Sequence, residues 1–360
     1  MQKFKSEYHI INGIYRIKID VPFEVGFVCT YIFQIDDSTI LIDSGLRSEN
    51  WKNKFFSILN KINIPISSID YCIVSHNHMD HIGLVSYLKQ KNPEIQILMH
   101  DITSKELKWE TNPENYHNIE KQAIELAKQL MSFGMTEKQS KTLIEYFTKW
   151  SKMKNYVKPD RILYDNDEIK FGNNSLKIIW TPGHTLGHIC IFDTNRKFLF
   201  SGDHILSRIT PHIGNYIINP VVKREYASYN FKNVLKLYLN SLDRIEKLNP
   251  KKIFPAHQEI IEDPIERIQE IREHHKNRIN EITNLISKDP RTPFEIAQKH
   301  FGPLDDVNTF LAVSEVLGHL IYLEEKDLVE RIERDGKIFF QLKENNKGVT
   351  QFKDPNNENH

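Results

Sequence analysis

The segment Ser75-His76-Asn77-His78-Met79-Asp80-His81 constrains this chain more than any other feature of its sequence. It follows the apolar run Ile69–Val74, which predicts a buried strand. His76 and His78 are two residues apart, so in an extended segment their side chains lie on the same side and can converge on one ion. Asp80 and His81 follow at the turn into a helix and can face a second ion. The segment therefore predicts a metal site at the end of a strand.

Three further residues suited to metal binding follow other β-rich runs. A polar side chain appears shortly after the end of each run, namely His184, Asp203 and His257. Neutral imidazole and carboxylate ligands together suit zinc best, with iron and manganese as alternatives. Two ions about 3.5–4 Å apart need more ligands than the first segment offers. The three residues at the strand ends would complete two such sites.

A pair of zinc ions would supply hydrolytic chemistry without a serine or cysteine nucleophile. A water that bridges two ions is acidified enough to be hydroxide at neutral pH, and one ion can polarise a carbonyl or phosphoryl oxygen. The three cysteines, Cys29, Cys72 and Cys190, each lie in an apolar run, and none belongs to a Cys-x-x-Cys pair. We therefore expect them to be buried small side chains rather than ligands or nucleophiles.

The segment His76–His81 resembles the His-x-His-x-Asp-His signature of the metallo-β-lactamase superfamily. Four more segments resemble other motifs of that family in the expected order: residues 41–45, 181–188, 201–203 and 255–257. The resemblance covers residues 10 to 260. It implies the α+β class and an αββα sandwich, in which two mixed sheets pack face to face with helices outside.

The same resemblance implies a role for each of the seven candidate residues. Two ions would share them as follows: His76, His78 and His184 on the first ion, Asp80, His81 and His257 on the second, and Asp203 bridging the two. We expect Asp80, His184 and Asp203 to be the catalytic residues. Related di-iron flavoproteins replace the second histidine by glutamate, so His78 favours two zinc ions.

Hydrophobic periodicity divides the chain into parts. Residues 104–153 are charged with a helical period and predict a helical insertion, which is either a packing appendage or a lid over the substrate pocket. We assign residues 1–275 to the catalytic domain. Residues 276–344 predict helix, helix and hairpin, which suggests a winged helix. The polar tail 345–360 has no periodicity and is predicted to be disordered.

The charge balance bears on partners and location. The chain has 48 basic and 48 acidic side chains, whereas nucleic-acid-binding proteins more often carry a basic excess. RNA is therefore disfavoured, although a local basic patch is compatible with a neutral total. No stretch approaches the roughly 18 apolar residues of a membrane span, and the N-terminus lacks the apolar core of a signal peptide. We expect a cytoplasmic protein without a membrane partner, which could form homo-oligomers.

Several other polar residues have an ordinary structural explanation. We expect Asp43 to accept hydrogen bonds that orient the metal loops, and His188 to be a hydrogen-bonded structural histidine. His204 and His212 could reach the pocket, although a lone histidine in a loop is usually polar surface, and the pair His274-His275 is expected to be exposed. Lys223 and Arg224 could attract an anionic substrate tail, with a solvated pair as the plainer interpretation. Tyr226 and Tyr229 lie between the third and fourth metal motifs, where related hydrolases often place substrate-contacting groups.

The leading functional hypothesis is metal-dependent hydrolysis of a small-molecule thioester or ester, similar to hydroxyacylglutathione hydrolase (glyoxalase II), through a metal-bound hydroxide. A metal-dependent endoribonuclease or other phosphodiesterase is the alternative, because a metallo-β-lactamase-like domain followed by a winged helix also resembles a ribonuclease-like branch. A lactonase is a further alternative.

A non-enzymatic interpretation makes the C-terminal unit a module that binds DNA or a protein partner. Its longer helix, Val307–Lys326, carries Glu315, Glu324, Glu325 and a single lysine, which disfavours contact with phosphate. We expect this helix to pack against the hydrolase or a second subunit instead.

Overall fold

The computed structural model describes residues 5–213 and 219–344. Among them, one sheet contains seven strands in chain order: β1 (Ser6–Ile11), β2 (Ile14–Asp20), β3 (Phe27–Ile35), β4 (Ser38–Ile42), β5 (Tyr71–Val74), β6 (Gln96–His100) and β7 (Arg161–Leu163). The first four strands form an antiparallel meander, and β4 to β7 run parallel. Parallel neighbours need crossover connections, which α1 (Glu49–Lys61), α3 (Val85–Lys91) and, between β6 and β7, the helices of residues 101–153 supply.

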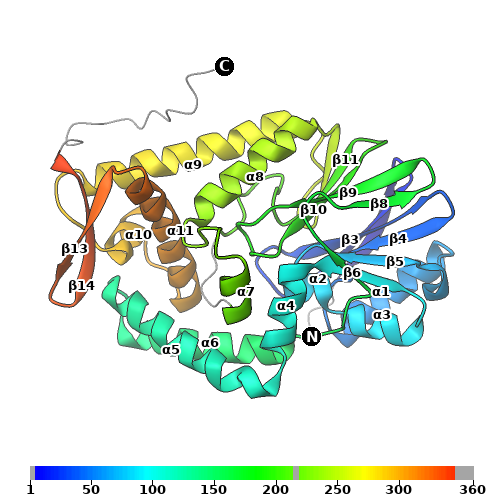
Figure 1. Cartoon of the computed structure of the whole chain (residues 1–360), viewed down its shortest axis with the longest axis horizontal. Coiled ribbons are helices and arrows are strands. Elements are labelled where there is room, and N and C mark those ends of the chain that lie inside the picture. Colours follow the sequence, from blue (N-terminus) through cyan, green and yellow to red (C-terminus); the bar gives the residue numbers. More distant parts are fainter. Residues whose placement is uncertain (1–4, 214–218, 345–360) are drawn as a thin grey trace.

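A second sheet has the strand order β12-β11-β10-β9-β8 within the described residues. Its strands are β8 (Glu168–Phe171), β9 (Asn174–Trp180), β10 (Ile189–Asp193), β11 (Phe198–Gly202) and β12 (Lys252–Pro255). Neighbours are antiparallel except β11 and β12, which are parallel and joined through α7 (Pro220–Glu225) and α8 (Val234–Leu248). Figure 1 shows the two sheets side by side.

Aromatic side chains fill the space between the sheets. Phe33 of the first sheet stacks on Phe200 of the second with ring centroids 4.9 Å apart, and Tyr31 meets Phe254 edge to face at 5.6 Å. Each of these rings is at most 2% exposed, and full burial of such a side chain contributes about 1.5–3 kcal/mol. Packing between the two sheets fixes their strand ends relative to one another.

Helices cover the outer faces. On the first sheet, α1 buries Trp51 and Phe55, while α8 and α9 (Pro264–Ile286) cover the second sheet. The predicted α+β class and the two sheets with helices outside are thus observed. No helix in the described part of the chain is both long and apolar enough to cross a membrane.

The predicted helical insertion consists of α4 (Asp101–Glu110), α5 (Tyr116–Ser132) and α6 (Glu137–Met153). A capping box begins α6, where Gln139 and Thr136 satisfy each other's backbone N–H groups. The insertion contacts the C-terminal part of the chain, since the backbone N–H of Phe294 donates to the Phe133 carbonyl at 3.1 Å. Figure 1 shows α5 and α6 below α10 and α11.

The C-terminal elements are α10 (Pro293–Phe301), α11 (Asp306–Glu325) and a hairpin of β13 (Val329–Arg334) and β14 (Lys337–Leu342). The turn residues Asp335 and Gly336 have φ of 49° and 70°, the left-handed geometry that a tight hairpin turn requires. Helix, helix and hairpin follow in the predicted order; the winged-helix assignment itself stays a prediction. The proposed domain boundary after residue 275 lies inside α9, and the predicted disordered tail lies outside the described residues.

Helix α11 is buried rather than displayed. Val313, Val316 and Leu320 are fully buried in an apolar cluster that extends to Cys190 and Leu199 of the second sheet. The helix packs on α6, α8, α9 and α10. Twelve of its twenty residues are buried.

Candidate metal centre

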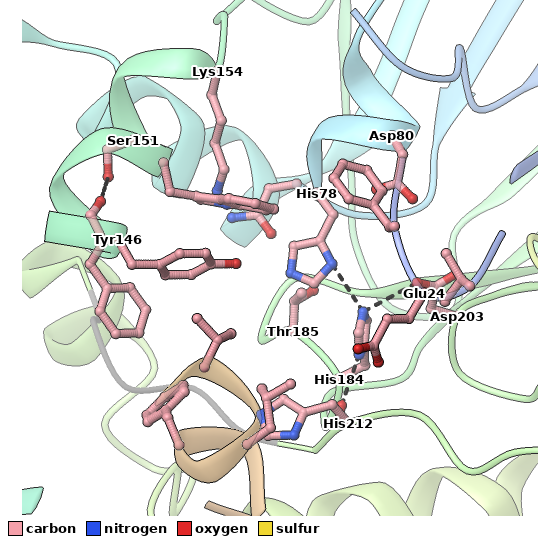
Figure 2. Close-up of a pocket in the computed structure, with 18 of the residues that line it drawn as sticks. Glu24, His78, Asp80, Tyr146, Ser151, Lys154, His184, Thr185, Asp203 and His212 are labelled. Atoms are coloured by element: carbon pink, nitrogen blue, oxygen red, sulfur yellow. Dashed lines mark hydrogen bonds and ion pairs between the residues drawn. The ribbon is translucent and has the colours of Figure 1, made fainter. Parts of the chain in front are cut away.

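Loops at one edge of the two sheets carry the seven candidate residues. The first loop follows β5 and leads into the short helix α2 (Met79–Ile82), and the others follow β9, β11 and β12. The structure gathers side chains from all four loops: His76, His78, Asp80, His81, His184, Asp203 and His257. Figure 2 shows four of them converging.

The first group comprises His76, His78, His184 and Asp203, whose ligand atoms all lie within 4.8 Å of one another. The Nε2 atom of His184 is 3.0 Å from Nδ1 of His78 and 3.3 Å from Oδ2 of Asp203. The Nε2 atom of His76 is 3.8 Å from the same Oδ2. Four ligand atoms that face a common point from different loops are the geometry of a metal site.

The second group comprises Asp80, His81 and His257. The Nε2 atom of His257 is 3.5 Å from Oδ2 of Asp80, and that of His81 is 3.8 Å from Oδ1. The second oxygen of Asp203, Oδ1, is 3.5 Å from Nε2 of His81 and 3.3 Å from Nε2 of His257. Asp203 therefore presents one oxygen to each group, which is the position of a bridging carboxylate.

Unpaired polar atoms test whether this site fits metal ions. The Nε2 atoms of His76 and His81 and Oδ1 of Asp203 are buried without a hydrogen-bond partner. A buried polar atom without a partner costs free energy, about 1–3 kcal/mol in proteins. One divalent cation in each group would satisfy all three atoms, so the set of ligand atoms fits two ions.

Protonation differs between the two groups. Burial, together with the neighbouring His81 and His78 rings, holds the pKa of His76 well below its usual value. Burial would also lower the pKa of His81, but the carboxylates around it, chiefly Asp203 and Asp43, raise that pKa well above its usual value. Burial would raise the pKa of Asp203, yet His257 and His81 hold it well below its usual range. The carboxylate of Asp203 is therefore ionised.

Asp43 fixes the loop that carries the first histidines. It lies directly after β4 with φ of 57°, a left-handed conformation that aspartate tolerates. Its Oδ1 accepts the backbone N–H of Ser75 at 2.7 Å, while Oδ2 accepts the Ser75 hydroxyl at 2.7 Å and Nδ1–H of His81 at 2.8 Å. The last bond leaves Nε2 of His81 free to act as a ligand. The orienting role predicted for Asp43 is confirmed.

Backbone carbonyls orient two more imidazoles in the same way. Nδ1–H of His184 donates to the carbonyl of His212 at 2.8 Å, and Nδ1–H of His257 donates to the carbonyl of Phe27 at 2.5 Å. In both rings Nε2 consequently points into the centre as an acceptor.

His188 is a hydrogen-bonded structural histidine, as predicted. Its Nε2 accepts the backbone N–H of Asp203 at 3.1 Å, and its Nδ1 lies 2.8 Å from the Thr181 hydroxyl. Gly202 has φ of 51°, and a Cβ there would lie 2.7 Å from Nε2 of His188. Glycine is thus required both by the backbone conformation and by the close approach of this ring.

The surface assignment was wrong for several histidines. His204 is fully buried, and burial lowers its pKa to about 3. His212 lines the cavity beside the centre, and His275 is 1% exposed within α9. Lys223 and Arg224 are exposed as expected. Tyr226 donates to Asp101 at 2.8 Å and, like Tyr229, contacts Trp180 instead of lining the cavity.

All three cysteines are buried and free, which confirms their prediction as small apolar side chains.

A cavity of about 840 Å³ opens onto the centre. His78, Asp80, His184, Asp203 and His257 lie in its wall, together with side chains of the insertion and of α11. Figure 2 shows Tyr146, Ser151 and Lys154 on the side opposite to the metal-ligand candidates. Local sequence patterns contain no direct signal for this cavity, because its far wall comes from segments distant along the chain.

Comparison with known proteins agrees with this geometry. The family model of the metallo-beta-lactamase superfamily matches residues 24–257. The Probable metallo-hydrolase YqjP of Bacillus subtilis is 25% identical over 333 residues, which is 92% of this chain and 98% of that protein. The Beta-lactamase-like protein 2 homolog of Caenorhabditis elegans is 25% identical over 268 residues, 74% of this chain and 68% of that protein.

Solved structures share the fold. A Beta-lactamase domain protein from Burkholderia ambifaria superposes with a TM-score of 0.75 at 22% identity and covers 94% of both chains. The metallo-beta-lactamase family protein TTHA1429 from Thermus thermophilus superposes with a TM-score of 0.73 at 22% identity. The superposition covers 92% of this chain and 99% of that chain. Both superpositions also cover most of the residues outside 24–257.

The family match covers more than half of the chain and includes all seven gathered side chains. The chain belongs to the metallo-β-lactamase superfamily, whose members are generally metal-dependent hydrolases.

Proposed function

We propose that this protein is a binuclear zinc hydrolase that cleaves thioester or ester bonds of a small-molecule acyl compound. The observation that carries the proposal is the position of Asp203, whose two carboxylate oxygens face two separate groups of ligand atoms at 3.3–3.8 Å. A shared carboxylate is typical of two-metal sites. Imidazole nitrogens supply most of the other ligand atoms, which favours zinc over harder cations.

The chain's own residues define where the reaction takes place. His76, His78 and His184 would hold one ion and Asp80, His81 and His257 the other. Such ions, when bound, would supply an activated water and polarise the carbonyl oxygen of the substrate. Asp203 would fix the separation of the two positions, and Asp43 orients His81. The cavity adjoins both positions, so a substrate bound in it would present its scissile carbonyl there.

The cavity favours an acyl compound over a nucleic acid. Among the described residues that line it, Lys154 is the single Lys or Arg, and its Nζ is 2.6 Å from Glu110. Glu24, Glu106 and Asp305 also line it. Contacts to a phosphodiester backbone come mainly from Lys and Arg side chains, and the lysine of this lining is already paired with Glu110. We therefore do not extend the proposal to an endoribonuclease; a lactone, as a cyclic ester, stays within the proposed class.

The location and the C-terminal unit are part of the proposal. We expect the protein to act in the cytoplasm on a small molecule. We also propose that the winged-helix-like unit supports the catalytic domain and does not bind DNA, because the apolar face of α11 is already buried against α6, α8 and α9.

A substrate screen with measured metal content tests the proposal. The purified protein is loaded with zinc, its metal content is determined, and thioesters, esters, lactones and a single-stranded RNA are offered in parallel. We expect close to two ions per chain and turnover of the thioesters or esters, abolished by a chelator and restored by zinc. Exchange of the exposed Asp37 for alanine serves as a control and should change neither value. Turnover of RNA alone would overturn the assignment.

A further inference from the structure

The apolar lining of the cavity comes from segments that lie far apart in the sequence. Phe23 and Val25 belong to the loop between β2 and β3, Trp150 belongs to α6, and Val307 and Leu311 belong to α11. Their side chains are apolar and face the same space. Its volume of about 840 Å³ lies within the range of about 300–1,000 Å³ for small-molecule sites.

Aromatic contacts join the two helices of this wall. The Tyr146 ring stacks on Trp150 at a centroid distance of 5.3 Å within α6, and Phe147 meets Phe310 of α11 edge to face at 5.6 Å. Such pairs contribute about 0.5–1.5 kcal/mol beyond their burial. Figure 2 shows Tyr146 pointing from α6 across the cavity toward His78. The wall is therefore built in part from rings that hold one another in place.

Polar groups of the wall are largely engaged with protein partners. Lys154 Nζ pairs with Glu110 at 2.6 Å, and the Ser151 hydroxyl donates to the Phe147 carbonyl at 3.2 Å. At the loop, Nδ2 of Asn308 donates to Oε1 of Glu24 at 3.2 Å and ties α11 to residues 22–25. A ligand in this part of the cavity consequently meets apolar surface rather than free charge.

The cavity thus has two unlike sides. One side carries the candidate metal ligands His78 and His184, and the other carries aromatic and aliphatic side chains. A molecule that fits both has a polar, cleavable bond at one end and an apolar body at the other. Burial of that body would contribute about 25 cal/mol per Å² of apolar surface.

We propose that α6 and α11 form an acyl-binding wall that selects substrates with a large apolar acyl group, either an extended alkanoyl chain or an aryl ring. The inference rests on the proposed function and names the part of the substrate that the site recognises. The selecting residues are Trp150 of the insertion and Leu311 of the C-terminal unit. Specificity consequently comes from two additions to the sheet sandwich, while the sandwich holds the metal ligands.

The test compares acyl groups on one thiol. Zinc-loaded wild type and variants are assayed with acetyl, hexanoyl, decanoyl and 2-naphthoyl thioesters of N-acetylcysteamine. Leu311→Trp fills the cavity and should lower kcat/KM for the decanoyl relative to the acetyl thioester by at least about tenfold. Trp150→Ala enlarges it and should shift the preference toward the bulkier acyl groups. Met153→Ala, on the same helix but 57% exposed, should keep the ratio within about twofold.

Binding of a fluorescent fatty acid separates failure of this inference from failure of the proposed function. The affinity for cis-parinaric acid is measured without turnover and should fall at least about tenfold in Leu311→Trp. If no ester or thioester is cleaved but this affinity changes as expected, the acyl-binding wall is supported and the proposed hydrolase function is refuted. If turnover is found but Leu311→Trp and Trp150→Ala affect all acyl lengths equally, the wall is wrong. Thermal unfolding verifies that each variant is folded, and Trp150→Phe should restore the wild-type preference. The naphthoyl and decanoyl arms distinguish aryl from extended acyl groups.

Discussion

Two buried histidine clusters differ in what their side chains face. In the metal centre, imidazole nitrogens face the carboxylates of Asp80 and Asp203 at 3.3–3.8 Å. A second cluster, called here the helix cluster, joins α9 to α11 and consists of His274, His275, Glu315 and His319. Its histidines mainly face each other and the backbone.

Hydrogen bonds account for most of the helix cluster. Nδ1–H of His319 donates to the Glu315 carbonyl at 2.7 Å, so Nε2 of His319 is an acceptor and takes Nδ1–H of His275 at 3.1 Å. The Glu315 carboxylate lies 3.7 Å from a guanidinium nitrogen of Arg278, which already supplies a positive charge. Nε2 of His275 and Oε1 of Glu315 have no hydrogen-bond partner.

The comparison shows that close histidines alone do not define a metal centre. Ligand atoms of His274, His275 and Glu315 also lie within 4.8 Å of one another. What the metal centre has in addition is a carboxylate shared between two groups and an adjoining cavity, whereas the helix cluster has an arginine beside its carboxylate. We infer that metal binds the first cluster and that the second one joins two helices.

Removal of the shared carboxylate should have the largest effect. Asp203→Ala deletes the ligand common to both groups, and the loss of several kcal/mol of transition-state stabilisation corresponds to a decrease of kcat/KM on the order of 10³-fold. Metal analysis of the variant should show fewer than two ions per chain. Glu315→Gln is the matched change in the helix cluster and should leave the metal content unaltered. Full activity of Asp203→Ala would contradict a two-metal site.

A smaller effect is expected from the residue that orients His81. Asp43→Asn keeps the shape but weakens the acceptor of Nδ1–H, so the affinity for zinc should fall by about 10–100-fold. Competition with a chromophoric chelator measures this affinity. Asp70→Asn, which alters a backbone contact with Thr39 away from the centre, is the control. An unchanged affinity in Asp43→Asn would show that His81 needs no such support.

Substitutions in the helix cluster should lower the stability of the protein and leave its metal content unchanged. His319→Leu leaves Nδ1–H of His275 without its acceptor, and a buried unpaired donor costs about 1–3 kcal/mol of unfolding free energy. Urea denaturation of the zinc-loaded variant measures the change. Loss of one equivalent of metal in this variant, or in His275→Ala, would contradict the inference that the helix cluster binds no metal.

The helix cluster should also make the stability depend on pH. Burial lowers the pKa of His319 to about 4, and burial with the neighbouring His319 holds the pKa of His275 well below its usual value. The unfolded chain, with a histidine pKa of about 6.5, therefore binds more protons than the folded chain below that pH. The stability that these rings contribute is fully present above about pH 6.5 and is lost as the pH falls toward 4.

The slope is at most about 1.4 kcal/mol per pH unit for each ring. Urea denaturation of wild type and of a His275→Phe, His319→Leu double variant between these pH values isolates the contribution. Parallel stability curves for the two proteins would contradict it.

The site was more accessible to sequence reasoning than the cavity. Ligands at strand ends converge because strands of a sheet end at one edge, so the spacing of His76, His78 and Asp80 and the later motifs were sufficient to identify all seven gathered side chains. The cavity wall depends on how α6 and α11 pack, which no local pattern in residues 137–153 or 306–325 specifies. Assignment of the seven as metal ligands stays a prediction.

The burial of His275 had a signal that was overlooked. His275 follows Ile271 by four residues and precedes Ile279 by four, which places it on the apolar stripe of α9. The charged neighbours of the His274-His275 pair concealed this periodicity. His204 had a weaker signal, since it follows directly on Asp203 in a loop where the neighbouring strand is wholly buried.

The two sides of the cavity are also separated in the order of synthesis. The last candidate ligand, His257, precedes α11 in the chain, and Leu311 and Phe310 follow only with that helix. A ribosome therefore completes every metal-ligand position before it makes the helix that closes the acyl side. If the proposed acyl-binding wall is correct, the part of the chain that selects among substrates is made after every candidate metal ligand.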